Sequence, residues 1–307
     1  MMLSRRHLLL STAVATAAAV AACGRSTTAG PDVSDPAEPL PPIEDRLVAL
    51  EQKYDAVVGL YGADLDSDRT VSHRDGDMFA MCSTFKAYLA ARVLYGAQQG
   101  ELRLDDTIVV NREALQPHSP VTEREVGRAV PLGTLCAATL QQSDNAAANL
   151  LLARIGGPPT ITAFARLIGD ERSRLDRWEV DLNSALPGDP RDTSTPRALG
   201  GGIRTLLTGT VLDETHRRQL DEWMRGNVTS ARSIRAGLPA GWTSADKTGS
   251  GDYASTNNVG IAYGPAGERI LLSIMTRTRG DDPEAPALQP LIAEVTALVL
   301  PVLLGRG

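Results

Sequence analysis

Apolar residues recur at helical spacing near both ends of the chain, beside short segments with the apolar pattern of strands. Leu47, Leu50 and Tyr54 form one stripe, which predicts a first helix over 43–54. Apolar residues over 288–304 predict a closing helix. Five segments alternate or run apolar as strands do, at 56–61, 70–73, 242–247, 258–263 and 270–276. Because these segments lie toward the two chain ends, we expect one sheet built from both of them.

Helical patterns dominate the middle of the chain. One begins at Ser83 and ends at Gly100, and further helical segments extend to about Met224. The sequence therefore predicts an α/β fold of two interleaved domains, with the sheet flanked by helices and an all-helical domain inserted. The expected bounds are 43–78 with 226–307 for the α/β domain and 79–225 for the all-helical domain. We expect the functional pocket between the two, where ligand sites commonly lie.

The N-terminus has the features of an export signal. Twin arginines at 5–6 precede an apolar run that ends at Ala22, and its roughly 15 residues are fewer than the roughly 20 that a membrane span needs. The run closes with Val-Ala-Ala-Cys, so we expect 1–23 to be a Tat-type signal with a lipoprotein box and an acylated Cys23. Simple cleavage near Ala22, which gives a secreted or periplasmic product, is the alternative. Residues 24–42 then form a disordered tether, and the lipid on Cys23 is the only expected membrane association, at the cell envelope.

The composition is that of an ordinary globular protein. The 307 residues are 42% hydrophobic and 22% charged, which is enough for a large core. A net charge of −6 provides no basic surface for nucleic acid. The four histidines are scattered without ligand spacing, so we expect no metal site. Nothing indicates an oligomer, and a monomer is expected.

Lys86 follows Ser83 by three residues in the segment Ser-Thr-Phe-Lys. On a helix this spacing puts both side chains on one face. A serine hydroxyl becomes an effective nucleophile when an adjacent base accepts its proton, so the pair is a candidate for covalent catalysis. Only three of the 31 basic residues are lysines, and both Lys86 and Lys247 lie in short polar motifs. Taken alone, the pair also fits a surface helix that happens to carry both residues.

Three more polar segments follow in order. Ser143 opens Ser-Asp-Asn, Glu179 opens Glu-Val-Asp-Leu-Asn and Lys247 opens Lys-Thr-Gly, at 60, 96 and 164 residues after Ser83. Each alone has a plain structural explanation, namely a helix cap, a solvated acidic loop or an edge strand. S-x-x-K with S-D-N and K-T-G is the signature of class A β-lactamases and penicillin-binding proteins. Over 43–304 the chain therefore resembles the class A serine β-lactamases.

The resemblance implies a role for each motif residue. Ser83 is expected to attack the strained ring amide, and its proton passes either to Lys86 or to Glu179 through a water. Ser143 is expected to relay a proton to the departing ring nitrogen. The backbone N–H groups of Ser83 and Ser250 are the expected oxyanion hole. Substrate contacts are implied for six residues, Asn145, Asn183, Lys247, Thr248, Ser250 and His118.

Glu179 and Asn183 distinguish an enzyme that hydrolyses its acyl intermediate from a protein that is only acylated. A carboxylate and an amide four residues apart can hold one water, and the carboxylate then acts as the general base that releases the acyl group. By resemblance, the active-site loop 177–192 that carries them is closed at its neck by an Arg177–Asp192 pair. Penicillin-binding peptidases have the serine and lysine motifs without this loop.

The resemblance also sets expectations for the sheet and the cysteines. It implies an antiparallel sheet of the β-lactamase/transpeptidase type and an enzyme without a cofactor. Some class A enzymes carry a disulfide, but the family partners of Cys136 and Cys82 are replaced here by Ala90 and Gly251. We therefore expect two buried free thiols.

Three positions depart from the commoner family pattern. Val180 replaces a proline, and we expect the peptide bond before it to be cis. His118 stands where an aromatic residue usually guards the cleft entrance, which should loosen one wall of the site. Ser233 stands where some relatives have an arginine for the substrate carboxylate, and Arg235 or Arg277 could compensate.

Together these observations predict a serine β-lactamase. It would hydrolyse the ring amide of penicillins, and by extension of cephalosporins, through a Ser83 acyl-enzyme that a Glu179-activated water deacylates. This activity would give antibiotic resistance. Two alternatives stay open: a penicillin-binding DD-peptidase, or a non-catalytic lipoprotein that senses β-lactams.

Overall fold

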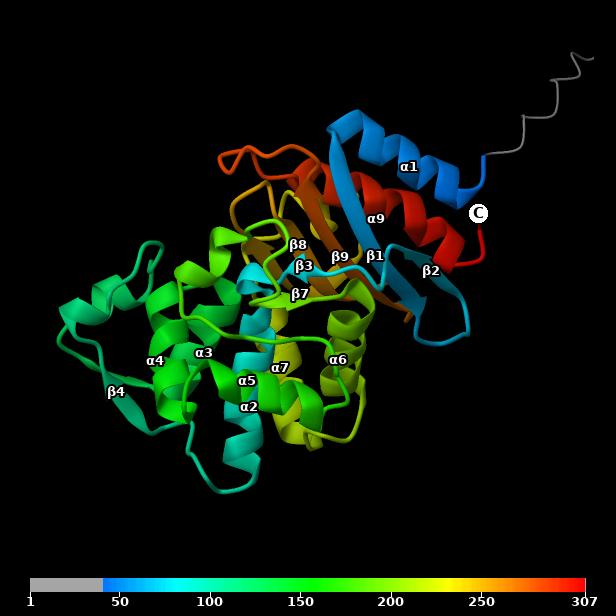
Figure 1. Ribbon diagram of the computed structural model, residues 1–307. Coiled ribbons are helices and arrows are strands. Elements are labelled where there is room, and N and C mark those ends of the chain that lie inside the picture. The colour runs from blue at the N-terminus through cyan, green and yellow to red at the C-terminus, as the bar shows by residue number, and fades with distance from the viewer. Residues whose placement is uncertain (1–40, 307) are drawn as a thin grey trace, which may run out of the picture. The chain divides into compact units, whose positions relative to one another are not determined.

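A five-stranded sheet organises the computed structural model, which describes residues 41–306. The strand order is β2-β1-β9-β8-β7, and every neighbouring pair is antiparallel. The strands are β1 (Ala56–Asp64), β2 (Thr70–His73), β7 (Thr243–Ser250), β8 (Thr256–Tyr263) and β9 (Arg269–Thr278). Two strands precede the helical region and three follow it, which confirms the expected antiparallel sheet built from both chain ends (Figure 1).

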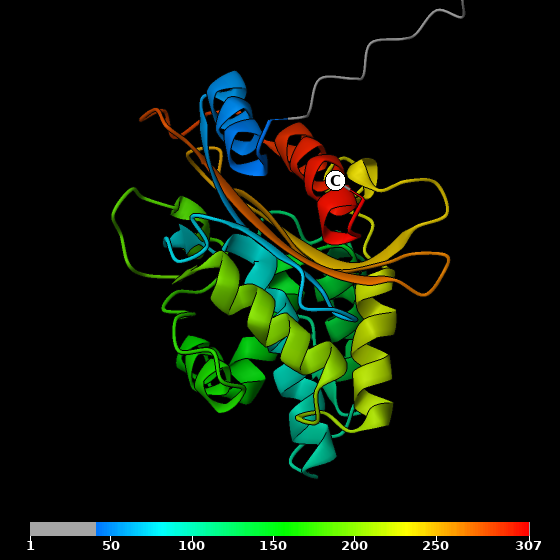
Figure 2. The same ribbon diagram turned by 90° about the vertical axis from the view of Figure 1, so that its right-hand side faces the viewer.

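Two helices from the chain ends cover one face of the sheet (Figure 2). They are α1 (Ile43–Tyr54), with the predicted bounds, and α9 (Gln289–Leu303), one residue shorter at each end than predicted. The short helix α8 (Ile234–Gly237) packs against α9. Their apolar sides and the facing strand residues form one buried cluster, which includes Leu47, Val58, Ile274 and Val295. Burial of this apolar surface fixes the two helices to the sheet.

The remaining helices form a second core on the other side of the sheet. α2 (Lys86–Gln98) runs through its middle; nine of its thirteen residues are buried and the other four are partly buried. Around it pack α3 (Leu132–Gln141), α4 (Asn145–Ile155), α5 (Pro158–Leu167), α6 (Pro196–Thr208) and α7 (Glu214–Arg225). α6 lies directly against β1 and β9, so it joins the helical region to the sheet (Figure 1).

The inserted region is not entirely helical, which corrects the sequence prediction. It contains two small antiparallel sheets, β3 (Phe79–Ala80) with β6 (Thr193–Ser194) and β4 (Thr107–Val109) with β5 (Ala129–Pro131). Strands of two or three residues are too short to show a period of two, so periodicity could not reveal them. Four 3₁₀ turns complete the region: η1 (Cys82–Phe85), η2 (Arg112–Ala114), η3 (Thr122–Glu125) and η4 (Asp181–Ser184).

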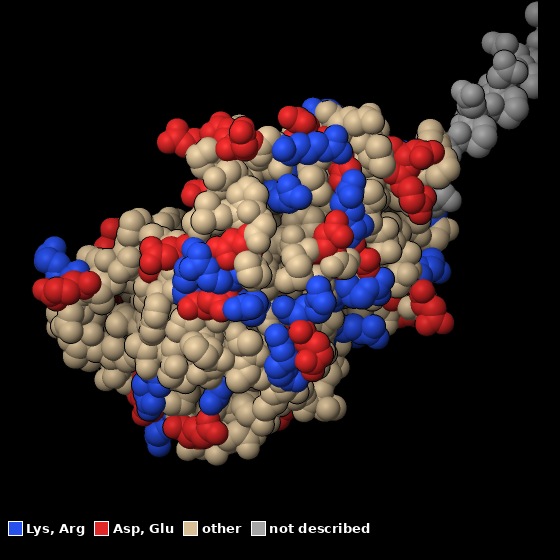
Figure 3. Space-filling view, in the orientation of Figure 1, with Lys and Arg blue, Asp and Glu red and all other residues tan. Residues whose placement is uncertain are grey.

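The surface mixes both signs of charge. On the face that Figure 3 shows, Lys and Arg side chains lie beside Asp and Glu side chains. Ion pairs such as Arg191–Asp189 and Arg269–Asp66 account for part of this mixture. Within the described residues, no three His, Cys, Asp or Glu side chains gather as a metal site would require.

The two cysteines of the described chain are free and fully buried, as expected. Cys82 lies in η1 and Cys136 lies in α3. Burial raises the pKa of both thiols. The predicted export signal, the acylated Cys23 and nearly all of the predicted tether lie outside the described residues. Over 41–306, no helix is both long and apolar enough to cross a membrane.

Candidate active site

Ser83 lies in the first turn of η1, at the floor of a cavity. A 3₁₀ turn has three residues per turn, so it brings Lys86 directly over Ser83 on the same face. The predicted shared face is therefore correct, although a 3₁₀ turn rather than an α-helix produces it. The Ser83 Oγ donates to Oε1 of Glu179 at 3.1 Å.

Lys86 is fully buried, and four acceptor atoms surround its ammonium group, of which Ser143 Oγ at 3.3 Å is the most distant. Its Nζ lies 2.8 Å from the Ser143 carbonyl oxygen, 2.5 Å from Asn145 Oδ1 and 2.8 Å from Glu179 Oε1. Burial lowers the pKa of Lys86, and the neighbouring Glu179 carboxylate offsets part of that decrease. The same carboxylate oxygen of Glu179 thus meets both the serine and the lysine.

The Ser-Asp-Asn segment links α3 to α4. Asp144 is the N-cap of α4 and accepts from the Ala147 N–H at 2.9 Å, so the helix-cap explanation holds for the central residue. It also accepts from the backbone and hydroxyl of Thr122. Ser143, in a left-handed conformation with φ 57°, and Asn145 lie on either side and line the cavity. The cap therefore fixes the positions of both flanking side chains.

Lys247 lies on β7, the edge strand beside η1. Its Nζ donates to Ser143 Oγ at 3.0 Å and to the Thr248 carbonyl oxygen at 2.8 Å. Burial holds the pKa of Lys247 well below its usual range, and the nearby Lys86 acts in the same direction. A Cβ at Gly249 would lie 2.7 Å from the Met81 carbonyl oxygen, so glycine is what lets β7 approach η1 so closely.

Glu179 is held in place by two asparagines. Asn183 Nδ2 donates to its Oε2 at 2.6 Å. Asn149, on α4, accepts from the Glu179 N–H at 3.0 Å and donates to its carbonyl oxygen at 2.7 Å. The peptide bond from Glu179 to Val180 is cis, as predicted. Sequence reasoning missed Asn149, although it follows Asn145 by one helical turn and so shares its face.

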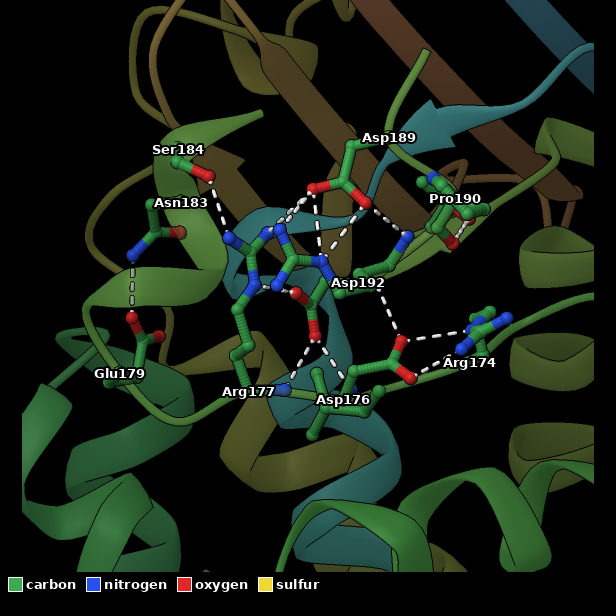
Figure 4. Close-up of polar contacts among 12 residues, drawn as sticks. Arg174, Asp176, Arg177, Glu179, Asn183, Ser184, Asp189, Pro190 and Asp192 are labelled. Atoms are coloured by element: carbon green, nitrogen blue, oxygen red, sulfur yellow. Dashed lines mark hydrogen bonds and ion pairs between the residues drawn. The ribbon is translucent and has the colours of Figure 1, made fainter. Parts of the chain in front are cut away.

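The neck of the loop 177–192 is closed by the predicted pair (Figure 4). Arg177 Nε donates to Asp192 Oδ2 at 2.5 Å, and Asp192 is fully buried. The other oxygen of Asp192 accepts from the N–H groups of Asp176 and Arg177 at 2.7 and 2.9 Å. Two further pairs, Arg174–Asp176 and Arg191–Asp189, flank it on the surface. The carboxylate of Asp192 is therefore satisfied by one side chain and two backbone donors.

The cavity above Ser83 has a volume of about 330 Å³. Seven of the ten predicted site residues line it, and the other three, Lys86, Glu179 and Lys247, are buried and contact lining residues. His118 lies at its wall with Nε2 2.9 Å from the Gln142 carbonyl oxygen. The full lining is Ser83, His118, Ser143, Asn145, Asn183, Thr229, Ser233, Thr248, Gly249, Ser250, Thr256, Asn257 and Gln289.

Four of these lining residues carry no motif and were not predicted. Thr229, Thr256, Asn257 and Gln289 come from a loop, from β8 and from the start of α9. Only the fold brings them beside the motifs.

Neither arginine proposed to compensate for Ser233 lines the cavity. The Arg235 guanidinium contacts Ser244 and Asp246, and it also donates to the Arg225 carbonyl oxygen. Arg277 lines a separate cavity together with Arg177 and Arg191.

The arrangement is that of a serine enzyme for acyl transfer. It places a serine hydroxyl on a buried carboxylate, two buried ammonium groups beside a second serine, and backbone N–H groups at the start of a helical segment. The comparisons with known proteins identify the family. Residues 42–302 match the profile of the Beta-lactamase enzyme family, and the chain belongs to it as a class A serine β-lactamase.

Its relatives include two curated enzymes and a reconstructed ancestor. The carbapenem-hydrolyzing beta-lactamase KPC of Klebsiella oxytoca is 43% identical over 241 residues, 78% of this chain and 82% of that enzyme. Beta-lactamase AST-1 of Nocardia asteroides is 40% identical over 306 residues, 97% and 96% of the two chains. The solved class A beta-lactamase of the last common ancestor of Gram-negative bacteria is 44% identical, with a TM-score of 0.81 over 85% of this chain and 98% of that one.

Proposed function

We propose that this chain hydrolyses the ring amide of penicillins and cephalosporins and so confers resistance to them. The family relationship supports β-lactam hydrolysis. The single observation that carries the mechanism is the contact of Ser83 and Lys86 with one buried Glu179 carboxylate, whose other oxygen is held by Asn183.

In the first step, Ser83 Oγ attacks the carbonyl carbon of the ring and loses its proton. Glu179 is the better-placed acceptor, because the hydroxyl already donates to its Oε1 while the three donors of Lys86 already face other acceptors. The oxyanion is stabilised by the N–H groups of Ser83 and Ser250, and one such donor typically contributes ~10²–10³ in rate. The carbon–nitrogen bond then breaks, and the ring nitrogen receives the hydroxyl proton of Ser143. Lys86 replaces that proton on Ser143, and Glu179 passes the Ser83 proton to Lys86, so Glu179 is again a carboxylate before the second step.

Ser143 is suited to that relay because of its own hydrogen bonds. Its Oγ accepts from Lys247 at 3.0 Å and from Lys86 at 3.3 Å, which leaves its hydroxyl proton free to be donated. The two buried ammonium groups favour a developing negative charge on this oxygen and can replace the proton that it gives up.

In the second step, a water attacks the ester carbon of the acyl-enzyme. Glu179 takes the proton from this water, and the Ser83 Oγ leaves with a proton to restore the free enzyme. Asn183 Oδ1 is buried and has no hydrogen-bond partner among the described residues, so an acceptor is available to orient the water beside Oε2 of Glu179. Asn145 keeps one amide N–H beyond its bond to Pro117, and we assign it to the substrate's side-chain amide.

Turnover of a chromogenic cephalosporin tests the proposal. The wild-type chain should hydrolyse many equivalents at a steady rate, and Ser83→Ala should lose the activity. A single stoichiometric burst from the wild type would contradict the proposal, because it would place the chain with slowly deacylated penicillin-binding peptidases or with β-lactam sensors.

We also propose that the chain is exported and lipid-anchored at the cell envelope as a monomer. The support is the twin-arginine start, the apolar run and the Val-Ala-Ala-Cys box that ends at Cys23. Labelled palmitate should be incorporated by cells that make the wild type and not by cells that make Cys23→Ala. A wild-type chain that stays unlabelled and appears in the culture medium or the periplasm would favour simple cleavage instead.

A further inference from the structure

The cavity that receives the substrate carries no formal charge on its lining. None of its thirteen lining residues is Asp, Glu, Lys or Arg. Penicillins and cephalosporins carry a carboxylate beside the ring, and such a group usually meets cationic or hydrogen-bonding partners in a protein. Arg235 and Arg277 lie outside the cavity, and the Lys247 ammonium is buried behind the lining, where it contacts Ser143 and Thr248. Neutral donors on the lining therefore make direct contacts with the carboxylate, and Lys247 adds its charge from behind them.

Most hydroxyl protons at this end of the cavity are already used within the protein. Ser233 Oγ donates to the Ser230 carbonyl oxygen and accepts from Asn258. Thr256 Oγ1 donates to the Ala254 carbonyl oxygen at 2.9 Å. A hydroxyl has one proton, so Ser233 and Thr256 offer only lone pairs to an anion.

The side-chain donors of two more lining residues are also used within the protein. Both amide donors of Asn257 face backbone carbonyl oxygens, those of Ala80 and Met81. Thr229 Oγ1 donates to Asn227 Oδ1 at 2.7 Å, so its close contact with Thr248 uses the proton of Thr248. The Thr248 hydroxyl can rotate and donate this proton to a ligand instead. The Thr229 hydroxyl already donates to Asn227 and does not require a donor to replace Thr248.

Gln289 and Ser250 remain uncommitted. Within the described residues, neither side chain makes a hydrogen bond, and both line the cavity. They also lie on adjoining walls. Ser250 pairs with Thr256 across β7 and β8, and Thr256 Oγ1 accepts from the N–H of Leu288, the residue before Gln289.

The position of Gln289 at a helix N-terminus adds an electrostatic field that favours an anion. It is the first residue of the fifteen-residue helix α9, whose positive end therefore lies at this wall of the cavity. Its amide N–H₂ is a donor that nothing else in the described protein occupies.

We propose that Gln289 is a specificity-determining residue that donates its side-chain amide to the substrate carboxylate, together with the hydroxyls of Thr248 and Ser250. The inference rests on the proposed β-lactam hydrolysis and adds a residue to it. Gln289 does not touch the reacting bond, so its loss should weaken substrate binding and leave the chemical steps unchanged.

Benzylpenicillin and its methyl ester provide the test, because they differ in the charge that Gln289 is proposed to bind. For benzylpenicillin, Gln289→Ala should raise KM about tenfold with kcat unchanged, as expected for the loss of one hydrogen bond to a charged group. For the ester, the same variant should change KM less than twofold. Gln289→Glu, which is nearly isosteric, should raise KM for the acid further through like-charge repulsion.

Gln52→Ala is the matched control, because Gln52 is exposed on α1 and its side chain makes no hydrogen bond within the described residues. An unchanged KM for benzylpenicillin in both Gln289 variants would overturn the inference, and so would an equal loss on acid and ester. Either result leaves the proposed function standing as long as the wild type turns over. A wild type that hydrolyses neither compound would overturn the proposed function, and this inference with it.

Discussion

Ser83 and Lys86 meet at one carboxylate and do not bond to each other. Glu179 Oε1 accepts from the serine at 3.1 Å and lies 2.8 Å from the ammonium group. A buried lysine beside a buried carboxylate is stable only when both groups are fully satisfied, and here every donor of Lys86 has an acceptor. In the proposed mechanism, the activity therefore depends on how accurately Glu179 is held.

Asn149 contributes to that accuracy, because it bonds both the backbone N–H and the backbone carbonyl oxygen of Glu179. Asn149→Ala should lower kcat for a chromogenic cephalosporin by about 10–100-fold with a smaller change in KM, because a misplaced base slows chemistry more than binding. Steady-state kinetics with Asn111→Ala as the control checks this, since Asn111 is exposed and makes no side-chain cap. Equal kinetics for the two variants would show that Glu179 is positioned by other contacts.

At the scale of elements, the active-site loop depends on its neck. Asp192 is fully buried and is held by Arg177 and by two backbone N–H groups (Figure 4). Arg191–Asp189 lies close by, but nearly half of the Arg191 side chain is exposed. The two ion pairs therefore provide a matched comparison of a buried pair with a surface pair in the same loop.

Arg177→Ala should lower the free energy of unfolding by about 3 kcal/mol and reduce kcat, since it leaves a buried carboxylate without its cation. The value lies at the lower end for such pairs because two backbone donors remain on Asp192. Arg191→Ala should cost less than about 1 kcal/mol, as exposed pairs do. Denaturant unfolding of both variants measures these free energies. Equal losses in the two variants would contradict the expected difference between the buried pair and the surface pair.

A second buried carboxylate, Glu51, joins α1 to the sheet. It accepts from the Val58 N–H at 2.9 Å, from Arg74 at 2.9 Å and from Arg279 at 3.0 Å. Burial alone raises the pKa of Glu51, but the hydrogen bonds from Arg74 and Val58 outweigh it and lower the pKa to about 2. The free energy that this carboxylate contributes is therefore present above its ordinary pKa of 4.5 and is lost as pH falls from there toward about 2.

Glu51→Gln should lower the free energy of unfolding by about 3 kcal/mol near pH 6. The difference in this free energy between the variant and the wild type should narrow steadily between pH 4.5 and 2. Urea unfolding across that range measures it, with the exposed Glu44→Gln as the control. A gap that stays constant with pH would mean that the ionised carboxylate is not what stabilises this junction.

The sequence predicts long elements better than short ones. The stripe of Leu47, Leu50 and Tyr54 gave the bounds of α1 correctly because a three-turn helix shows its period. Strands of two or three residues show none, and the small sheets of the inserted region were missed for that reason.

The site residues also differ in how far a local pattern reveals them. The motif residues could be found because each chemical group sits in a short local pattern. Asn149 and Gln289 belong to no such pattern. The packing of α4 against the loop gives Asn149 its partner, and the packing of α9 against β8 brings Gln289 to the cavity wall.

At the scale of the whole molecule, two cores lie on opposite faces of one sheet, and both are closed without a covalent link between cysteines in the described residues. Cys82 and Cys136 are both completely buried. The stability of this part of the chain therefore comes from packing and hydrogen bonding, and a reductant has no disulfide within it to break.

Thiol titration should reflect this burial. Cys82 and Cys136 should be unreactive toward a disulfide reagent in the native protein, because burial excludes the reagent and raises the pKa of both thiols. Denaturation should then release two additional reactive thiols, and a reductant should leave the melting temperature unchanged. A melting temperature that falls on reduction would contradict the assignment of both cysteines as free.

Glu179 is the proposed base that releases the acyl group, and intact-protein mass spectrometry of Glu179→Ala tests this role. After prolonged incubation with benzylpenicillin, this variant should gain the mass of one whole penicillin on Ser83, more slowly than the wild type because Lys86 must then accept the Ser83 proton. It should keep that mass for minutes, while the wild type returns to its free mass within the mixing time. If Glu179→Ala deacylates as fast as the wild type, Glu179 is not the deacylating base.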